Sequence, residues 1–325
     1  MEGDELCFPQ LNTSCRKLKR SHFDTVCTHI ILSSISLLTA ALNLLVIISI
    51  SHFKQLHTPT NLLLLSLAVS DFFVGLLMFF QITLIDGCWY FGDVVCVIYS
   101  VLDIVITSSS VGTMVLISVD RYAAICYPLH YPTKVTQRRV QICVSLCWIC
   151  SLFYAALMMK ESLKQSARLN SCIGECVIDF DFTKQFVDLM LTFILPISVI
   201  IVLYLRVFVV AVSHARAMRS NITALTLQRS GKVTAKKSEL KAARTLGVVV
   251  LVFLACFCPY FCVSLTGQEN LISYASSIFV VSLFYFNSCL NPIIYAFFYP
   301  WFRKCIKVIM TLQILQSRSS NANIL

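Results

Sequence analysis

The sequence contains few charged residues for its length. Lys, Arg, Asp and Glu make up only 13% of the 325 residues, against about 25% in an ordinary soluble protein. A water-soluble chain this long needs a polar exterior, and so few charges cannot cover that much surface. Hydrophobic residues reach 58%, so the apolar excess must face lipid, and a soluble fold is excluded.

Residue groupings typical of enzymes and transporters are also missing. No nucleophile stands beside a positioned base, and no His, Cys, Asp or Glu cluster has the spacing of a metal site. Inverted repeats and paired spans broken by Gly or Pro, which mark many transporters, are absent as well. The sequence therefore argues against an enzyme, and it keeps an ion-coupled transporter only as a disfavoured alternative.

Seven apolar runs are long enough to cross a bilayer, whose core of about 30 Å needs about 20 apolar residues. The runs cover 27–51, 61–84, 97–120, 140–159, 186–211, 244–266 and 273–297. They predict an all-α membrane protein with three parts: an extracellular N-terminal tail (1–26), a seven-transmembrane helix bundle (27–297), and an amphipathic eighth helix with a cytoplasmic tail (298–325).

The basic residues gather on one side of these spans. That side holds 18 of the 26 Lys and Arg residues, with Asp120 and Glu239 as its acids, while the other side has 8 basic and 11 acidic residues. The positive-inside rule makes the basic side cytoplasmic and the N-terminus extracellular. The net charge of +10 thus reflects topology and does not indicate nucleic acid. The first sequon, at Asn12, is on the outer side, where glycosylation is expected.

Characteristic residues stand in or beside the apolar runs, in every span and in a set order. They are Asn43; Leu67, Ala68 and Asp71; Asp120, Arg121 and Tyr122; Trp148; Pro196 and Tyr204; Pro259; and Asn291, Pro292 and Tyr295. This set resembles the rhodopsin-like G-protein-coupled receptors, and the stretch 287–302 resembles the fingerprint of trace amine-associated receptors. The resemblance implies a plasma-membrane receptor for small cationic amines, an olfactory neuron as its site, and a stimulatory G protein that raises cyclic AMP.

Two carboxylates lie at similar depth in the predicted membrane. Asp103 precedes Arg121 by 18 residues and Asp188 precedes Tyr204 by 16, which places them about 27 Å and 24 Å from the inner ends of their helices. Neighbouring helices lie roughly 8–10 Å apart, a gap that a short alkyl diamine can bridge. Intramembrane acids mark functional sites by default, so the physical expectation is a diamine site.

Family resemblance adds that Asp103 holds the ligand ammonium, and that fish olfactory members with a second aspartate respond to diamines. The expected ligand-binding residues are Asp103, Asp188, Tyr285, Tyr260, Phe261, Phe284 and Thr107. Two alternatives leave Asp188 structural and make the protein a monoamine receptor. In the first, Asp188 pairs with Lys184, four residues earlier; in the second, burial keeps its carboxyl group protonated. The aromatic residues serve as packing in the plainer interpretation.

Two further sites rest on the resemblance. It implies a sodium site at Asp71, Ser110, Asn287, Ser288 and Asn291, with an ion-free, water-filled polar network as the alternative. It also implies a cytoplasmic latch that the G protein replaces, in which Arg121 pairs with Asp120 and Glu239. The expected activation residues are Asp120, Arg121, Glu239, Phe257, Tyr204, Asn291, Pro292 and Tyr295, and Phe257 stands where the family commonly has tryptophan.

Six cysteines lie on the predicted outer side: Cys7, Cys15, Cys88, Cys96, Cys172 and Cys176. Six cysteines allow fifteen pairings, so counting alone leaves their connectivity open. The resemblance implies the pairs Cys96–Cys176 and Cys15–Cys172, and it leaves Cys7 and Cys88 unassigned. On the inner side, Cys305 is either lipidated or packed beneath the amphipathic helix.

Overall fold

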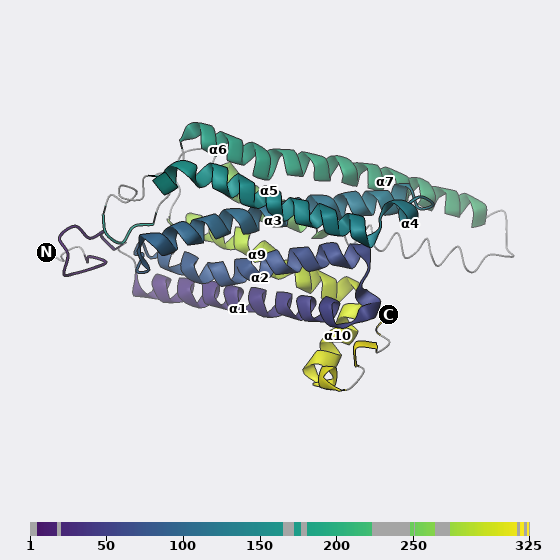
Figure 1. Ribbon diagram of the computed structural model, residues 1–325, viewed down its shortest axis with the longest axis horizontal. Coiled ribbons are helices and arrows are strands. Elements are labelled where there is room, and N and C mark those ends of the chain that lie inside the picture. The colour runs from purple at the N-terminus through teal and green to yellow at the C-terminus, as the bar shows by residue number, and fades with distance from the viewer. Residues whose placement is uncertain are drawn as a thin grey trace.

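The computed structural model is a bundle of long helices that run side by side (Figure 1). It describes residues 5–17, 21–164, 172–176, 181–222, 248–249, 251–263, 274–316, 319–321 and 324. The N-terminal segment lies at one end of the bundle, and the short helix α10 lies at the other (Figure 1). We refer to these as the N-terminal end and the α10 end.

The long helices correspond to the predicted spans. They are α1 (His22–His52), α2 (Pro59–Ile85), α3 (Gly92–Cys126), α5 (Gln137–Lys164), α6 (Phe182–Asp188) continuing through the π-helical turn η2 (Leu189–Ile194) into α7 (Leu195–Ile222), and α9 (Tyr274–Phe298). In the described part of the chain, six helices are long and apolar enough to cross a membrane, and Leu251–Val263 is a shorter apolar helix inside the predicted sixth span.

Several helices extend past the apolar runs from which they were predicted. α3, for example, covers Gly92–Cys126, against a predicted span of 97–120. A run of apolar residues measures only the stretch that must sit in hydrocarbon, whereas backbone hydrogen bonding continues into the polar boundary on both sides. The bundle is therefore longer than the sequence pattern alone indicates.

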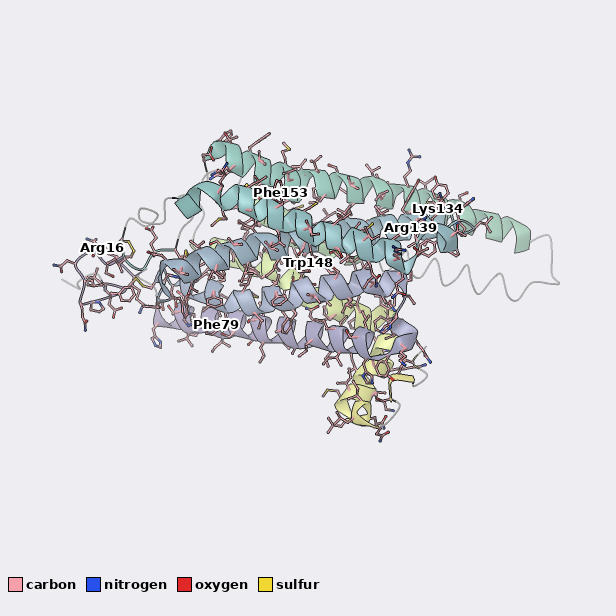
Figure 2. The ribbon with its side chains drawn as sticks, in the orientation of Figure 1. Arg16, Phe79, Lys134, Arg139, Trp148 and Phe153 are labelled. Carbon is pink, nitrogen blue, oxygen red and sulfur yellow. A yellow bond between two sulfur atoms is a disulfide. The ribbon has the colours of Figure 1, made fainter. Side chains whose placement is uncertain are left out.

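The outer faces of the helices are apolar, as expected for surfaces that contact lipid. Phe79 on α2 and Phe153 on α5 are 60% and 64% exposed, and both are labelled in Figure 2. Inside the bundle, α1 and α2 approach closely at Gly75, where a Cβ atom would lie 2.8 Å from the backbone nitrogen of Ala40. The Ser36 hydroxyl donates to the Gly75 carbonyl at 2.6 Å.

The amphipathic helix α10 (Pro300–Met310) leaves the bundle at a steep angle (Figure 1). It buries Trp301, Phe302 and Cys305 in the cluster that also contains Phe53 and Leu56, beside the end of α1. Cys305 is 0% exposed, and burial raises the pKa of its thiol to about 11. The structure thus shows the packed alternative for Cys305.

Two disulfide bonds tie the N-terminal segment to two loops, and a third ties one of these loops to α3. We call residues 5–17, 87–92 and 172–176 together the disulfide cap. The structure contains the expected pairs Cys96–Cys176 and Cys15–Cys172, and it also joins Cys7 to Cys88, which the sequence left unassigned. Backbone hydrogen bonds reinforce the cap, from Cys7 N to Cys15 O at 2.9 Å, from Cys15 N to Ile173 O at 2.9 Å and from Trp89 N to Gly174 O at 2.8 Å.

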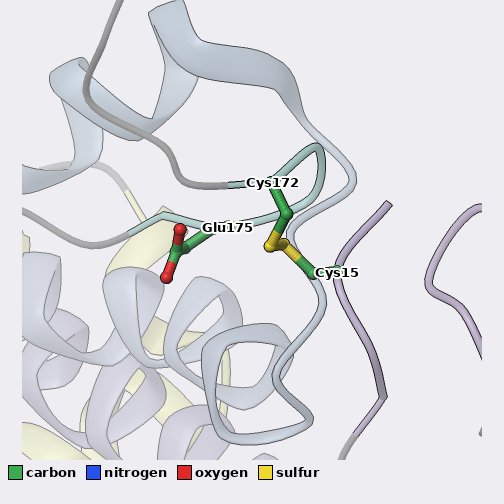
Figure 3. Close-up of side chains that lie close together, drawn as sticks. All are labelled: Cys15, Cys172 and Glu175. Atoms are coloured by element: carbon green, nitrogen blue, oxygen red, sulfur yellow. A yellow bond between two sulfur atoms is a disulfide. The ribbon is translucent and has the colours of Figure 1, made fainter. Parts of the chain in front are cut away.

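Glu175 lies close to the sulfur atoms of Cys15 and Cys172, a grouping that resembles a metal site (Figure 3). Both sulfur atoms are consumed by their disulfide bond, and the ligand that binds a metal is the thiolate. The three residues are therefore part of the cap. Asn12, in the same segment, is exposed, as a glycosylated side chain must be.

Candidate functional site

Asp103 lies half-buried on α3, and a tyrosine of α9 faces it. The Tyr285 hydroxyl lies within hydrogen-bonding reach of the Asp103 carboxylate. Gln81 on α2 joins two tyrosines beside Asp103, because its Oε1 accepts hydrogen bonds from the Tyr99 hydroxyl at 2.6 Å and from the Tyr285 hydroxyl at 3.5 Å. Gln81 and Tyr99 were not expected from the sequence. Thr107 is also half-buried, one turn further along α3 on the same face.

Asp188 is the last residue of α6, directly before the π-helical turn η2. The hydroxyl of Tyr154, on α5, donates to Asp188 Oδ1 at 2.6 Å. The Thr192 hydroxyl donates to the backbone carbonyl of Asp188 at 2.7 Å. The sequence pointed to Lys184 as the alternative partner of Asp188, whereas the bond in the structure comes from Tyr154 on a different helix. Single π-helical turns are frequent at functional sites.

Asp103 and Asp188 lie near enough for their charges to act on each other. α3 packs against α7, and the two carboxylates lie close enough for their negative charges to repel each other. Each carboxylate is paired with one tyrosine hydroxyl, Tyr285 for Asp103 and Tyr154 for Asp188. The arrangement offers two anionic acceptors to a ligand that carries positive charge at both ends.

Aromatic rings connect this site to the bundle interior. Tyr260 lies 4.8 Å from Phe284, and Phe284 lies 5.4 Å from Tyr285, measured between ring centroids. Phe261 stacks on Phe193 at 4.2 Å and is only 7% exposed. Tyr260 and Phe284 thus adjoin the Asp103 site, whereas the face of Phe261 is occupied by packing.

Phe257 continues the aromatic chain away from the ligand site. Its ring lies 4.5 Å from Phe284 and stacks on Phe253 at 4.2 Å. Phe257 is 5% exposed and Phe253 is 1% exposed, so the chain is closely packed. Phe284 therefore connects the Asp103 site to a buried stack in the helix Leu251–Val263.

Asp71 is fully buried in the middle of the bundle. Its carboxylate accepts hydrogen bonds from Ser288 and Asn291, both at 2.8 Å, and from Ser110 at 3.5 Å. Within the described ranges, the side-chain oxygen of Asn287 is buried without a hydrogen-bond partner. A carboxylate, two hydroxyls and an unpartnered amide oxygen form the all-oxygen donor set that a hard cation prefers. These residues fit a sodium ion.

Arg121 and Asp120 form an ion pair near the α10 end, with Arg121 Nε donating to Asp120 Oδ2 at 3.0 Å. Two neutral side chains complete the group. Tyr131, in the short helix α4 (Tyr131–Lys134), donates to Asp120 Oδ1 at 2.7 Å, and Thr60 of α2 donates to Asp120 Oδ2 at 3.0 Å. Thr60 and Tyr131 were not expected from the sequence, and Glu239 lies outside the described residues.

The remaining expected activation residues lie around the same end. Pro292 stands inside α9, and Tyr204 is half-buried on α7. Tyr295 is 2% exposed and borders a cavity of about 20 Å³ that also touches Arg121 and Thr60. About 10–15 Å³ suffices for one water molecule, so the cavity has room for water between Tyr295 and the ion pair.

Comparisons with known proteins extend over the whole chain. The family model described as 7 transmembrane receptor (rhodopsin family) matches residues 42–295. Trace amine-associated receptor 13c of Danio rerio is 39% identical over 336 residues, which cover 99% of this chain and 97% of that protein. Trace amine-associated receptors 8b and 4 of Mus musculus are 37% and 36% identical, each over 98% of this chain and 96% and 95% of their own lengths.

Proposed function

Because the chain belongs to the rhodopsin family of seven-transmembrane receptors, and within it to the trace amine-associated receptors, we propose that it recognises small alkyl diamines. Membership of this family makes the chain a multi-pass plasma-membrane receptor, which binds an amine and acts through a G protein. It also removes the basis for the transporter alternative. The single observation that carries the diamine proposal is Asp188, a second carboxylate whose charge acts on that of Asp103.

Electrostatics favours a ligand with two positive charges. A carboxylate in a site of low dielectric is costly unless it is paired, and here two of them repel each other. A monoamine bound at Asp103 neutralises one charge and leaves Asp188 with the Tyr154 hydroxyl alone. A diamine neutralises both carboxylates at once, with Tyr285 supporting the ammonium at Asp103 and Tyr260 and Phe284 lining the alkyl chain.

The same proposal includes the signalling direction. The N-terminal end faces the extracellular side, where Asn12 is glycosylated, and the α10 end meets a stimulatory G protein that raises cyclic AMP. The charge of the α10 end supports this orientation through the positive-inside rule. The Arg121–Asp120 pair holds the receptor inactive until the G protein replaces it. We place the protein in olfactory sensory neurons on the strength of its family alone.

We further propose that Asp71 and its neighbours bind an allosteric sodium ion. Asp71, Ser110 and Ser288 would hold the cation, with the unpartnered oxygen of Asn287 as an additional donor. A bound cation would offset the cost of a fully buried carboxylate. Asn291 would then keep its hydrogen bond to the second oxygen of Asp71.

A cyclic AMP assay in cells expressing the receptor tests the diamine proposal. We expect an alkyl diamine to be at least tenfold more potent than the monoamine of equal chain length, since the monoamine leaves the buried charge of Asp188 without a cation, which costs more than the about 1.4 kcal/mol of a tenfold change. Asp188→Asn should abolish this difference while keeping a monoamine response, and Asp103→Asn should remove both responses. Equal potency of the two amines on the unmodified receptor would contradict the proposal.

The second candidate is a monoamine receptor in which Asp188 is structural. The Tyr154–Asp188 hydrogen bond, at 2.6 Å, is the observation that favours it, because it already gives the carboxylate one partner. Under this candidate, Asp188→Asn lowers surface expression and shifts the response to every amine by the same factor.

A further inference from the structure

We propose that Tyr154 is a positioning residue for the second ammonium site, and that it makes the receptor selective for diamines of a particular length. The inference rests on the proposed diamine function and adds a residue to it. Tyr154 does not contact the ligand in this proposal. It acts through Asp188, whose Oδ1 atom it binds at 2.6 Å.

The hydrogen bond leaves Asp188 able to receive a ligand. A carboxylate has two oxygen atoms and about four acceptor positions, and Tyr154 occupies one position on Oδ1. Acceptor positions beyond the one used by Tyr154 can take an ammonium group. A hydroxyl that donates to a carboxylate also stabilises its negative charge, so Tyr154 favours the ionised form that a second ammonium requires.

Asp188 is held at two points. Tyr154 fixes the carboxylate, and Thr192 fixes the backbone carbonyl of the same residue by donating to it at 2.7 Å across the π-helical turn. A short acidic side chain held at both its carboxylate and its backbone keeps one rotamer. Without the phenol, the carboxylate would be restrained only at the backbone and would be free to turn toward or away from Asp103.

Tyr154 also connects Asp188 to the helix pair that carries Asp103. α5, which bears Tyr154, packs directly against α3. The approach is close at Gly112, where an added Cβ atom would collide with the Cys147 sulfur. Because α3 and α5 are locked together, the Tyr154 bond fixes the separation of the two carboxylates. That separation determines which diamine fits both of them.

The hydrogen bond from Tyr154 affects only the Asp188 side of the proposed site. Tyr285, the corresponding phenol at Asp103, is shared with Gln81 at 3.5 Å, and it belongs to the ammonium site that a monoamine also uses. Loss of the Tyr285 hydroxyl should therefore weaken every amine ligand. Loss of the Tyr154 hydroxyl should weaken only those ligands that reach Asp188.

The test compares Tyr154→Phe with the unmodified receptor in a cyclic AMP assay, using alkyl diamines of increasing chain length and the monoamine of each length. We expect the potency ratio of diamine to monoamine to fall about tenfold, the scale of a hydrogen bond to a charged group. The optimum in chain length should become broader. Monoamine potency should change by less than about twofold.

Two controls separate this role from a general loss of structure. Tyr90→Phe removes the same hydroxyl from a residue that is 52% exposed, and it should leave the ratio and the chain-length profile unchanged. In an Asp188→Asn background, Tyr154→Phe should have no further effect on the ratio. Surface labelling of each variant reports whether the receptor folds and reaches the membrane.

Three results would overturn the inference. Two of them concern Tyr154 alone, and the third also overturns the proposed diamine function. If Tyr154→Phe keeps both the ratio and the sharp chain-length optimum, Tyr154 does not position Asp188. If it weakens monoamines and diamines equally, its role is structural. If the unmodified receptor shows no preference for diamines, the proposed function itself is wrong, and the role of Tyr154 falls with it.

Discussion

Four aspartates lie in the interior of the bundle, and they differ in the groups that stabilise them. Asp71 receives three hydrogen bonds from hydroxyl and amide groups, and Asp120 has a full ion pair with Arg121. Asp103 and Asp188 have one tyrosine hydroxyl each as a neutral partner. Buried charges are usually paired or bound to a metal, so these last two are the ones that leave room for a cationic ligand.

Asp71→Asn tests the sodium proposal at the residue scale. The amide keeps the shape of the side chain but removes the negative charge that a cation needs. We expect agonist potency in the unmodified receptor to fall as sodium replaces choline in the buffer, and to be independent of sodium in the variant. Membranes at constant ionic strength provide the measurement. A sodium effect that persists in Asp71→Asn would contradict the site.

The sequence predicted the charged members of each site and the polar partners of Asp71, but it missed several other neutral partners. Asp103 and Asp188 stood out because charge is rare inside apolar runs. Tyr154, Gln81 and Thr60 did not, because a tyrosine, glutamine or threonine within a span is compatible with simple packing. Their roles depend on contacts across 18 to 204 residues of sequence, which a single helix pattern does not contain.

At the scale of elements, short irregular pieces position the chemistry. The π-helical turn η2 directly follows Asp188, and the four-residue helix α4 brings Tyr131 to Asp120. Hydropathy predicted the long helices well, since a membrane imposes a minimum apolar length. It contained no signal for α4 or η2, because short turns are set by local hydrogen bonding and by packing against neighbouring helices.

Tyr131→Phe tests whether α4 helps to hold the Arg121–Asp120 pair that we propose keeps the receptor inactive. The change removes the 2.7 Å hydrogen bond to Asp120, a loss of about 1.5–3 kcal/mol for a bond to a charged group. Asp120 then holds Arg121 less firmly, so we expect basal cyclic AMP to rise severalfold at equal surface expression. Tyr127→Phe, at a 55% exposed position nearby, is the matched control and should leave basal cyclic AMP unchanged. An unchanged basal level in Tyr131→Phe would show that α4 does not restrain activation.

At the scale of the whole molecule, the two ends are stabilised by different means. The α10 end is held by apolar packing of Trp301, Phe302 and Cys305 against α1. The N-terminal end is held covalently, and among its described residues the backbone segments meet at isolated bridges. Small loop-rich regions that cannot build a core commonly rely on disulfide bonds, and the disulfide cap fits that pattern.

Removing the Cys7–Cys88 bond tests how much the cap contributes. The double change Cys7→Ser with Cys88→Ser avoids leaving an unpaired thiol. Because this bond closes a separation of 81 residues, we expect the unfolding free energy to fall by about 2–4 kcal/mol, seen as a lower melting temperature of the purified receptor. The same change in Cys27→Ser, a free cysteine outside the cap, should have little effect. Equal melting temperatures for the cap variant and the unmodified protein would mean that the bond adds no stability.

The connectivity of the cap also dictates an order of maturation. With the N-terminal end extracellular, as proposed, Cys7 and Cys88 are both available once residue 88 has been translocated, whereas the other two bonds must wait for Cys172 and Cys176. At about 5–20 residues per second, the delay is roughly 4–17 seconds of synthesis. During that interval Cys15 and Cys96 remain reactive thiols beside a finished bond. Correct pairing therefore depends on α5 being inserted into the membrane before an oxidant joins Cys15 to Cys96.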